Sequence, residues 1–310
     1  MVVTPQHFAP LQPQNMMQTN QLVAAMDHYP SAFCDYYVLY QPDVRAQLAI
    51  FDGDRPQVAI SKEQAAGWIG KSITLYRESR DFFRTIDERT FEERNHLFHI
   101  GIDVNDRAYG TAGPGNFVLS TGALDSDYGW LIATHELAHV LQFDRWEAED
   151  GLFYEHLDVE VNGDSPLLLS NGILPLFFEA SRLGDTSYVI PGRGPVIRVD
   201  PLYYEEYLNA PAHRAAAGLA YFLWDMRDAL ISEYGDERGT LFAHRLFYKG
   251  IEVFGQWPVK QRLTYEVNAR LFSSNIAVIL AYFKPDLLPR FKSALNLLGF
   301  PAPSSIISGF

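Results

Sequence analysis

The segment from Asp127 to about Trp146 constrains the fold most, because its helical pattern has two unlike faces. One face is an apolar stripe that would hold the helix in a core, formed by Trp130, Ala133, Leu137, Val140 and Leu141. The other face carries His135, Glu136 and His139. Burying this helix is unfavourable unless its imidazoles and its carboxylate find partners.

The polar face matches the pattern H-E-x-x-H. At 100° per residue the two histidines lie about 40° apart and one turn apart, so both rings can reach one metal ion. Glu136 projects beside the pair, where it can contact a water held by the metal without being a ligand. Two surface histidines on an amphipathic helix are the alternative. The metal interpretation requires a third ligand.

Glu179 is the candidate for that ligand. Residues 172–183 form a second helical pattern, with Pro175 in its first turn and Glu179 as its only acidic residue. Glu179 follows His139 by 40 residues. An isolated carboxylate in an apolar helix is unfavourable unless it meets a metal or a cation. The alternative to a ligand is therefore a buried ion pair with Arg182 or another arginine.

The segment HELAHVLQF, followed some 40 residues later by LFFEASRL, resembles the gluzincin zinc metallopeptidases, in particular the bacterial peptidase MA-like type. The resemblance covers about residues 97–230. It implies one catalytic Zn²⁺ held by His135, His139 and Glu179, with Glu136 as the general base.

Some positions depart from related patterns. Ala180 stands where glycine is usual after the third ligand, and Leu183 stands where thermolysin-like members have an acid. Asp185 is the candidate for the orienting role of that acid. A metzincin would have glycine and histidine where this chain has Gln142 and Arg145, so that class is excluded.

The resemblance also suggests roles for the surroundings of the helix. Asn116–Ser120 precedes it as the edge strand does in gluzincins, where a substrate backbone pairs with that strand, and an ordinary core strand is the alternative. His213 stands just before a helical segment and is the candidate donor to the oxyanion, with Tyr203 and Tyr204 as rivals.

An acidic stretch follows the helix. Between Asp144 and Asp164 there are eight acidic residues and one basic residue. Residues 158–163 resemble the first half of a calcium loop, but Leu169 stands where a bidentate glutamate is needed, so a full EF-hand is excluded. A looser Ca²⁺ site, an acidic rim that favours cationic substrates and a solvated loop stay open.

Composition excludes several classes of protein. The chain has 25 lysines and arginines against 38 aspartates and glutamates, a net charge of −13, which argues against a general nucleic-acid binder. No apolar run is long enough for a membrane span, which needs about 18–20 residues. The single cysteine, Cys34, excludes an internal disulfide. No signal-peptide pattern is visible, which predicts a cytoplasmic protein, or a secreted one if the sequence starts at a mature N-terminus.

The expected fold is α+β. Residues 1–25 are expected to be a loose lead-in, residues 26–146 a zincin-like lobe with a small sheet and the H-E-x-x-H helix, and residues 147–310 a mainly helical lobe with the third zinc ligand. Strands are predicted at 36–40, 46–51, 97–104 and 116–120, a helix from Ser61 to Ile86, and a loop at glycines 110, 113 and 115. Further helices are predicted near 205–234, 236–253, 258–283 and 285–298.

The predicted function is zinc-dependent hydrolysis of peptide bonds in a peptide or protein substrate. An endopeptidase is favoured, because the G-x-M-E-N segment of exopeptidases is absent. Two alternatives stay open: a catalytically silent zincin-like fold that binds a protein partner, and a zinc hydrolase of non-peptide amides.

Overall fold

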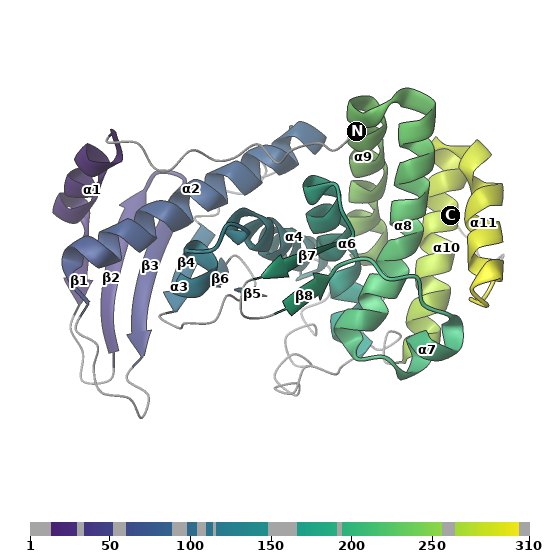
Figure 1. The fold of residues 1–310 in the computed structure, drawn as a ribbon, viewed down its shortest axis with the longest axis horizontal. Coiled ribbons are helices and arrows are strands. Elements are labelled where there is room, and N and C mark those ends of the chain that lie inside the picture. The colour runs from purple at the N-terminus through teal and green to yellow at the C-terminus, as the bar shows by residue number, and fades with distance from the viewer. Residues whose placement is uncertain are drawn as a thin grey trace.

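A mixed β-sheet with a long helix across one face joins a group of packed helices (Figure 1). The structure is a computed structural model, and it describes residues 14–29, 34–51, 60–88, 98–103, 110–113, 116–147, 166–190, 194–255 and 264–303. Over these residues the fold is α+β and mostly helical, as the sequence predicts.

The sheet has the strand order β1-β2-β3-β4-β6-β5. Its strands are β1 (Asp27–Tyr29), β2 (Cys34–Gln41), β3 (Val44–Phe51), β4 (Phe98–Asp103), β5 (Gly110–Gly113) and β6 (Asn116–Ser120). β3, β4 and β6 run parallel to one another, and the other neighbours are antiparallel. Because side chains alternate along a strand, Leu39, Ala46 and Leu48 share the face that is buried in the core.

Helix α2 (Lys62–Ile86) covers that face (Figure 1). Its start forms a capping box: the backbone N–H of Gln64 donates to Ser61 Oγ over 3.1 Å, and the N–H of Ser61 donates to Gln64 Oε1 over 3.0 Å. Such a cap stabilises a helix by about 1 kcal/mol. Ile69 and Ile73 face the sheet from α2. A short helix, α1 (Gln14–Ala25), packs on α2 within the N-terminal segment.

The remaining elements form the helical part. They are α3 (Thr121–Leu124), α4 (Gly129–Glu147), α6 (Pro166–Leu183), α7 (Tyr204–Asn209), α8 (Ala212–Tyr234), α9 (Asp236–Gly255), α10 (Tyr265–Phe283), a 3-10 turn η2 (Pro285–Leu287) and α11 (Leu288–Leu297), with a hairpin of β7 (Ser187–Ile190) and β8 (Gly194–Ile197). One hydrophobic core runs through both parts, from Leu39 in the sheet to Phe300 after α11.

The structure corrects three expectations. The loop predicted at the glycines is wrong at Gly110–Gly113, which form the edge strand β5. Asn116–Ser120 is not an edge strand, because β6 pairs with β4 on one side and β5 on the other. Pro175 lies inside α6 rather than in its first turn, because the apolar residues from Pro166 onward already belong to the helix.

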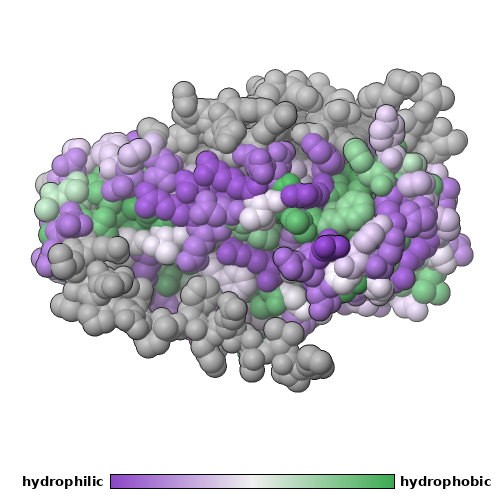
Figure 2. All heavy atoms as spheres, turned by 90° about the horizontal axis from the view of Figure 1, so that it is seen from above, coloured by the Kyte–Doolittle hydropathy of each residue, from purple (hydrophilic) through white to green (hydrophobic). Residues whose placement is uncertain are grey.

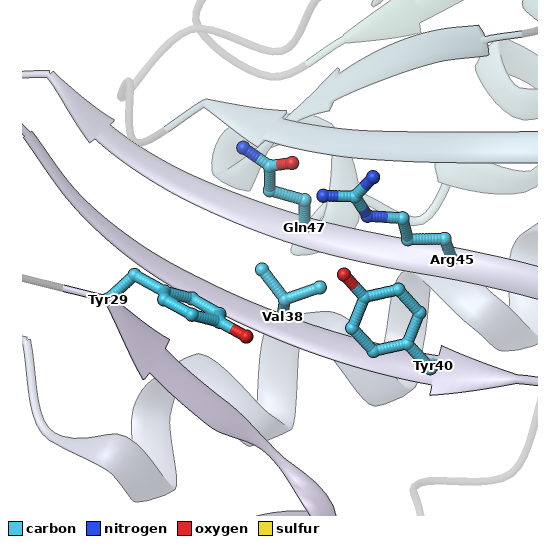
Figure 3. A pocket seen from close by; sticks show the side chains of 5 residues that line it. All are labelled: Tyr29, Val38, Tyr40, Arg45 and Gln47. Atoms are coloured by element: carbon cyan, nitrogen blue, oxygen red, sulfur yellow. The ribbon is translucent and has the colours of Figure 1, made fainter.

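The face of the sheet away from α2 carries a shallow hollow of about 310 Å³. Figure 3 shows the side chains that line it, Tyr29, Val38, Tyr40, Arg45 and Gln47, on the strands β1, β2 and β3. The guanidinium of Arg45 lies over the ring of Tyr40, 5.2 Å from its centre. None of the five lining residues is a histidine or a carboxylate. The hollow therefore lacks the groups that the sequence singles out for chemistry.

Hydrophilic residues cover much of the coloured surface in Figure 2; apolar residues reach the surface at both ends, with a larger patch toward the helical end. Exposed aromatic residues in that part include Tyr234, Tyr282 and Phe283. Among the described helices, none is long and apolar enough to cross a membrane.

Candidate metal centre

Helix α4 carries the H-E-x-x-H segment through the middle of the molecule, packed against α2, α6 and the strands β5 and β6. Its apolar stripe is buried as expected, with Ala133, Leu137 and Val140 fully covered. Arg182 of α6 fixes the helix from the side, since its guanidinium donates to the hydroxyl of Thr134 and to the backbone oxygen of Trp130. The sequence therefore places the polar residues of α4 in a protected interior.

The two histidines meet through their Nε2 atoms, which lie 3.1 Å apart. Two imidazole ligands of one tetrahedral zinc ion, each about 2.0–2.1 Å from it, have their nitrogens about 3.3 Å apart. The Nδ1–H of His135 donates to Oε2 of Glu179 over 2.9 Å, and this bond leaves the Nε2 of His135 as an acceptor. The pair thus has the spacing of two ligands of one metal ion, and His135 has the tautomer that a ligand needs.

Glu136 lies under the edge strand β5. A methyl group added at Gly110 would stand only 2.6 Å from both Cγ and Oε1 of Glu136, so glycine is what lets the strand approach so closely. The pKa of Glu136 is raised to about 7, chiefly by burial; the charges of His135 and Arg198 lower it and that of Glu179 raises it, each with a smaller effect than burial. A carboxyl group with this pKa can accept and return a proton near neutral pH.

Glu179 is completely buried and lies beside the pair. The hydroxyl of Tyr188 donates to its Oε1 over 2.6 Å, and Nε of Arg198 lies 2.8 Å from the same oxygen. The Arg198 contact is an ion pair whose alignment falls short of a hydrogen bond. The buried ion pair that the sequence left open is therefore formed, with Arg198 rather than with Arg182.

The surroundings of Glu179 and His139 lower the pKa of both groups. Burial by itself would raise the pKa of Glu179, but Arg198 and the hydrogen bonds from His135 and Tyr188 outweigh burial and lower it. Burial, with smaller effects of His135 and His213, holds the pKa of His139 well below its usual value. Glu179 is therefore ionised and His139 is neutral at physiological pH, which are the states that metal ligands need.

The other predicted residues lie in different surroundings. His213 is exposed at the start of α8, with its ring centre 6.2 Å from that of His135, so the structure brings it to the pair. Tyr204 begins α7 and packs its ring against Tyr207 and Phe300. Tyr203, its rival, is exposed.

Asp185 does not orient a histidine in this structure. It is exposed in the turn after α6, where its Oδ1 accepts from the backbone N–H groups of Thr186 and Ser187. The carboxylate that orients His135 is Glu179 itself.

Sequence patterns did not identify Tyr188 and Arg198 as neighbours of the site, and they did not show that the amide of Gln142 is buried. Tyr188 and Arg198 belong to the hairpin segment, where two short β-branched and aromatic runs on either side of a Pro-Gly-rich sequence are a recognisable strand signal. Gln142 follows His139 by three residues and shares its helix face. It is fully buried, and neither atom of its amide has a hydrogen-bond partner among the described residues.

The donor set fits a metal ion in its chemistry, since two imidazoles converge next to a buried carboxylate. However, Glu179 approaches His135 at Nδ1 and not at Nε2. Within the described ranges, no group of three histidine, cysteine, aspartate or glutamate side chains is arranged to hold a metal ion. The third-ligand role of Glu179 stays a prediction. The predicted calcium segment, 158–163, lies outside the described residues.

Comparison with known proteins gives no further guidance: no protein-family profile, no curated protein and no solved structure matches this chain.

Proposed function

We propose that this chain is a zinc-dependent hydrolase of peptide bonds with a zincin-like site on α4. The observation that carries the proposal is the convergence of the Nε2 atoms of His135 and His139, 3.1 Å apart, beside a buried carboxyl group, Glu136, with a pKa raised to about 7. In the proposal these histidines hold the ion, with Glu179 as the third ligand that the resemblance implies.

A bound zinc ion supplies Lewis acidity and lowers the pKa of a coordinated water. The residues of this chain do the rest. Glu136 takes the proton of the attacking water and passes it to the amine that leaves. His213, exposed beside His135, donates a hydrogen bond to the oxyanion.

The substrate in this proposal is a peptide or protein, cleaved internally. The edge strand β5 supports that assignment, because its outer side has no strand partner within the described sheet and its backbone passes directly over Glu136. An extended peptide can add to such an edge by backbone hydrogen bonds.

A digestion assay with casein and a mixed peptide library tests the proposal. We expect the wild type to cleave peptides in the presence of zinc, a chelator to abolish cleavage, and Glu136→Gln to lower the rate by about 10²–10⁴-fold while still binding zinc. Cleavage of other amides but not of peptides would move the chain to the class of non-peptide hydrolases.

The competing proposal is a catalytically silent fold that binds a protein partner. The position of Glu179 at Nδ1 of His135, away from the converging Nε2 atoms, favours it. Absence of zinc and of any cleavage after metal is added would support this alternative.

A further inference from the structure

The hairpin β7–β8 is the part of the structure whose contacts with the site have no assigned role. Its strands are antiparallel, with Tyr188 opposite Val196. Tyr188 and Val196 pack on the start of α4 in a small cluster that includes Leu131, and the ring of Tyr188 stacks on Tyr128 with the centres 4.6 Å apart. This packing fixes the hairpin beside the histidine pair.

Two side chains of this hairpin segment reach Glu179. Tyr188, in β7, donates to Oε1 over 2.6 Å. Arg198, the residue after β8, pairs with the same oxygen at 2.8 Å, and its Nη2 donates to the hydroxyl of Tyr188 over 3.1 Å. Its guanidinium also lies over the Tyr188 ring, 5.5 Å from the centre. The two residues therefore support each other as well as Glu179.

The two oxygens of Glu179 have different partners. Oε1 is held by the hairpin, whereas Oε2 receives the Nδ1–H of His135. Oε1 thus accepts one hydrogen bond and lies in one ion pair, both from the hairpin segment. The orientation of the carboxylate thus depends on the hairpin, and the tautomer of His135 depends on the carboxylate.

We propose that Tyr188 and Arg198 are positioning residues for the metal centre: they act through Glu179 to fix the tautomer of His135, one of the two converging histidines. This inference rests on the proposed function. Groups that hold a metal ligand from behind typically change metal affinity by 10–100-fold when they are removed.

A purely structural role is the opposing interpretation. In that case Arg198 would only neutralise a buried carboxylate, and Tyr188 would only fill space in the cluster with Leu131. Tyr188→Phe separates the two interpretations, because it keeps the ring, the packing and every charge and removes only the hydroxyl. Tyr128→Phe is the matched control, since Tyr128 belongs to the same cluster and stacks on Tyr188.

The experiment measures the zinc affinity of the full chain by competition with a chromogenic chelator, together with the visible spectrum of the cobalt-substituted protein. We expect Tyr188→Phe to weaken zinc binding about 10–100-fold and to change the cobalt spectrum, with Tyr128→Phe within about twofold of the wild type. Arg198→Lys keeps the charge but not the contact with Tyr188, and we expect it to weaken binding as well. Thermal unfolding of each metal-free variant verifies that it is folded.

Each result decides one question. Zinc affinities and cobalt spectra of Tyr188→Phe and Arg198→Lys equal to those of the wild type would overturn the positioning role and leave the proposed function intact. A wild type that binds neither zinc nor cobalt would overturn the proposed function, and the positioning role with it.

Discussion

At the scale of single residues, Glu136 combines a position in the H-E-x-x-H motif, a buried environment and a carboxyl group that can transfer a proton. Its position in H-E-x-x-H predicts a general base, and the structure adds the property that the sequence cannot show, a pKa raised to about 7 by burial. The spacing of a motif fixes which face of the helix a residue occupies. Whether that face is shielded from water depends on α6, β5 and the hairpin, which come from other parts of the chain.

The raised pKa of Glu136 makes the stability of the metal-free protein depend on pH. The folded state holds this proton more tightly than the unfolded state, so the stabilisation is complete below about pH 4.5 and is lost as the pH rises through about 7. We expect the free energy of unfolding of the wild type, relative to Glu136→Gln, to fall by roughly 3 kcal/mol across that range. Urea unfolding in a chelator at several pH values measures this difference, and parallel pH profiles for the two proteins would contradict it.

Gln142 gives a second prediction for a single residue. Within the part of the chain that the structure describes, its buried amide has no hydrogen-bond partner, which is destabilising. Gln142→Met keeps the length of the side chain and removes both polar atoms, so we expect it to raise the free energy of unfolding by about 1 kcal/mol. Urea unfolding checks this. Destabilisation of similar size would show instead that the amide makes a bond in solution.

At the scale of elements, the edge strand β5 and helix α4 form the closest contact in the site. Gly110→Ala places a methyl group 2.6 Å from Glu136, so this side chain must move. A displacement of about 1 Å at a reacting group lowers the rate by about 10²-fold, and we expect that loss in kcat with zinc binding unchanged.

Gly67→Ala is the matched control for this variant. A methyl group there meets no atom within 4 Å, and Gly67 lies inside α2. We expect unchanged kcat and a gain in stability of about 0.5–1 kcal/mol, because alanine favours a helix. Equal kcat values for Gly110→Ala and the wild type would show that β5 does not position Glu136.

The elements with strong local signals are also those that the sequence predicts correctly. Strand β6 matches its predicted bounds, and α2 runs from Lys62, directly after the predicted start at Ser61, to the predicted end at Ile86. The sequence missed β5, whose glycines look like a loop, because the reason for them is the approach to Glu136 from a distant helix. The hairpin was missed for a related reason: Tyr188 gains its role only by pairing with Arg198 and Glu179 in three dimensions.

At the scale of the whole molecule, the candidate site is assembled from two distant stretches of the chain. The histidines and Glu136 belong to the N-terminal part, whereas Glu179, Arg198 and His213 follow the long acidic segment. The helical periodicity of the sequence predicts the helices of the histidine pair and of Glu179 separately, and it does not predict Arg198. What brings them together is the packing of α4 on α6, which no local pattern specifies.

The continuity of the core gives a prediction at this scale. One cluster of buried residues includes Leu48 of the sheet, Leu137 of α4 and Phe222 of α8. We therefore expect the described parts to unfold together, in a single calorimetric transition whose van't Hoff and calorimetric enthalpies agree. Two resolved transitions would show that the sheet and the helices are stable independently.

The central claim is that α4 carries a metal centre, and the zinc content of the purified chain tests it most directly. Elemental analysis after equilibration with zinc and removal of the excess should find about one ion per chain in the wild type and almost none in the double variant His135→Ala/His139→Ala. Equal zinc in the two proteins, or none in either, would contradict the account.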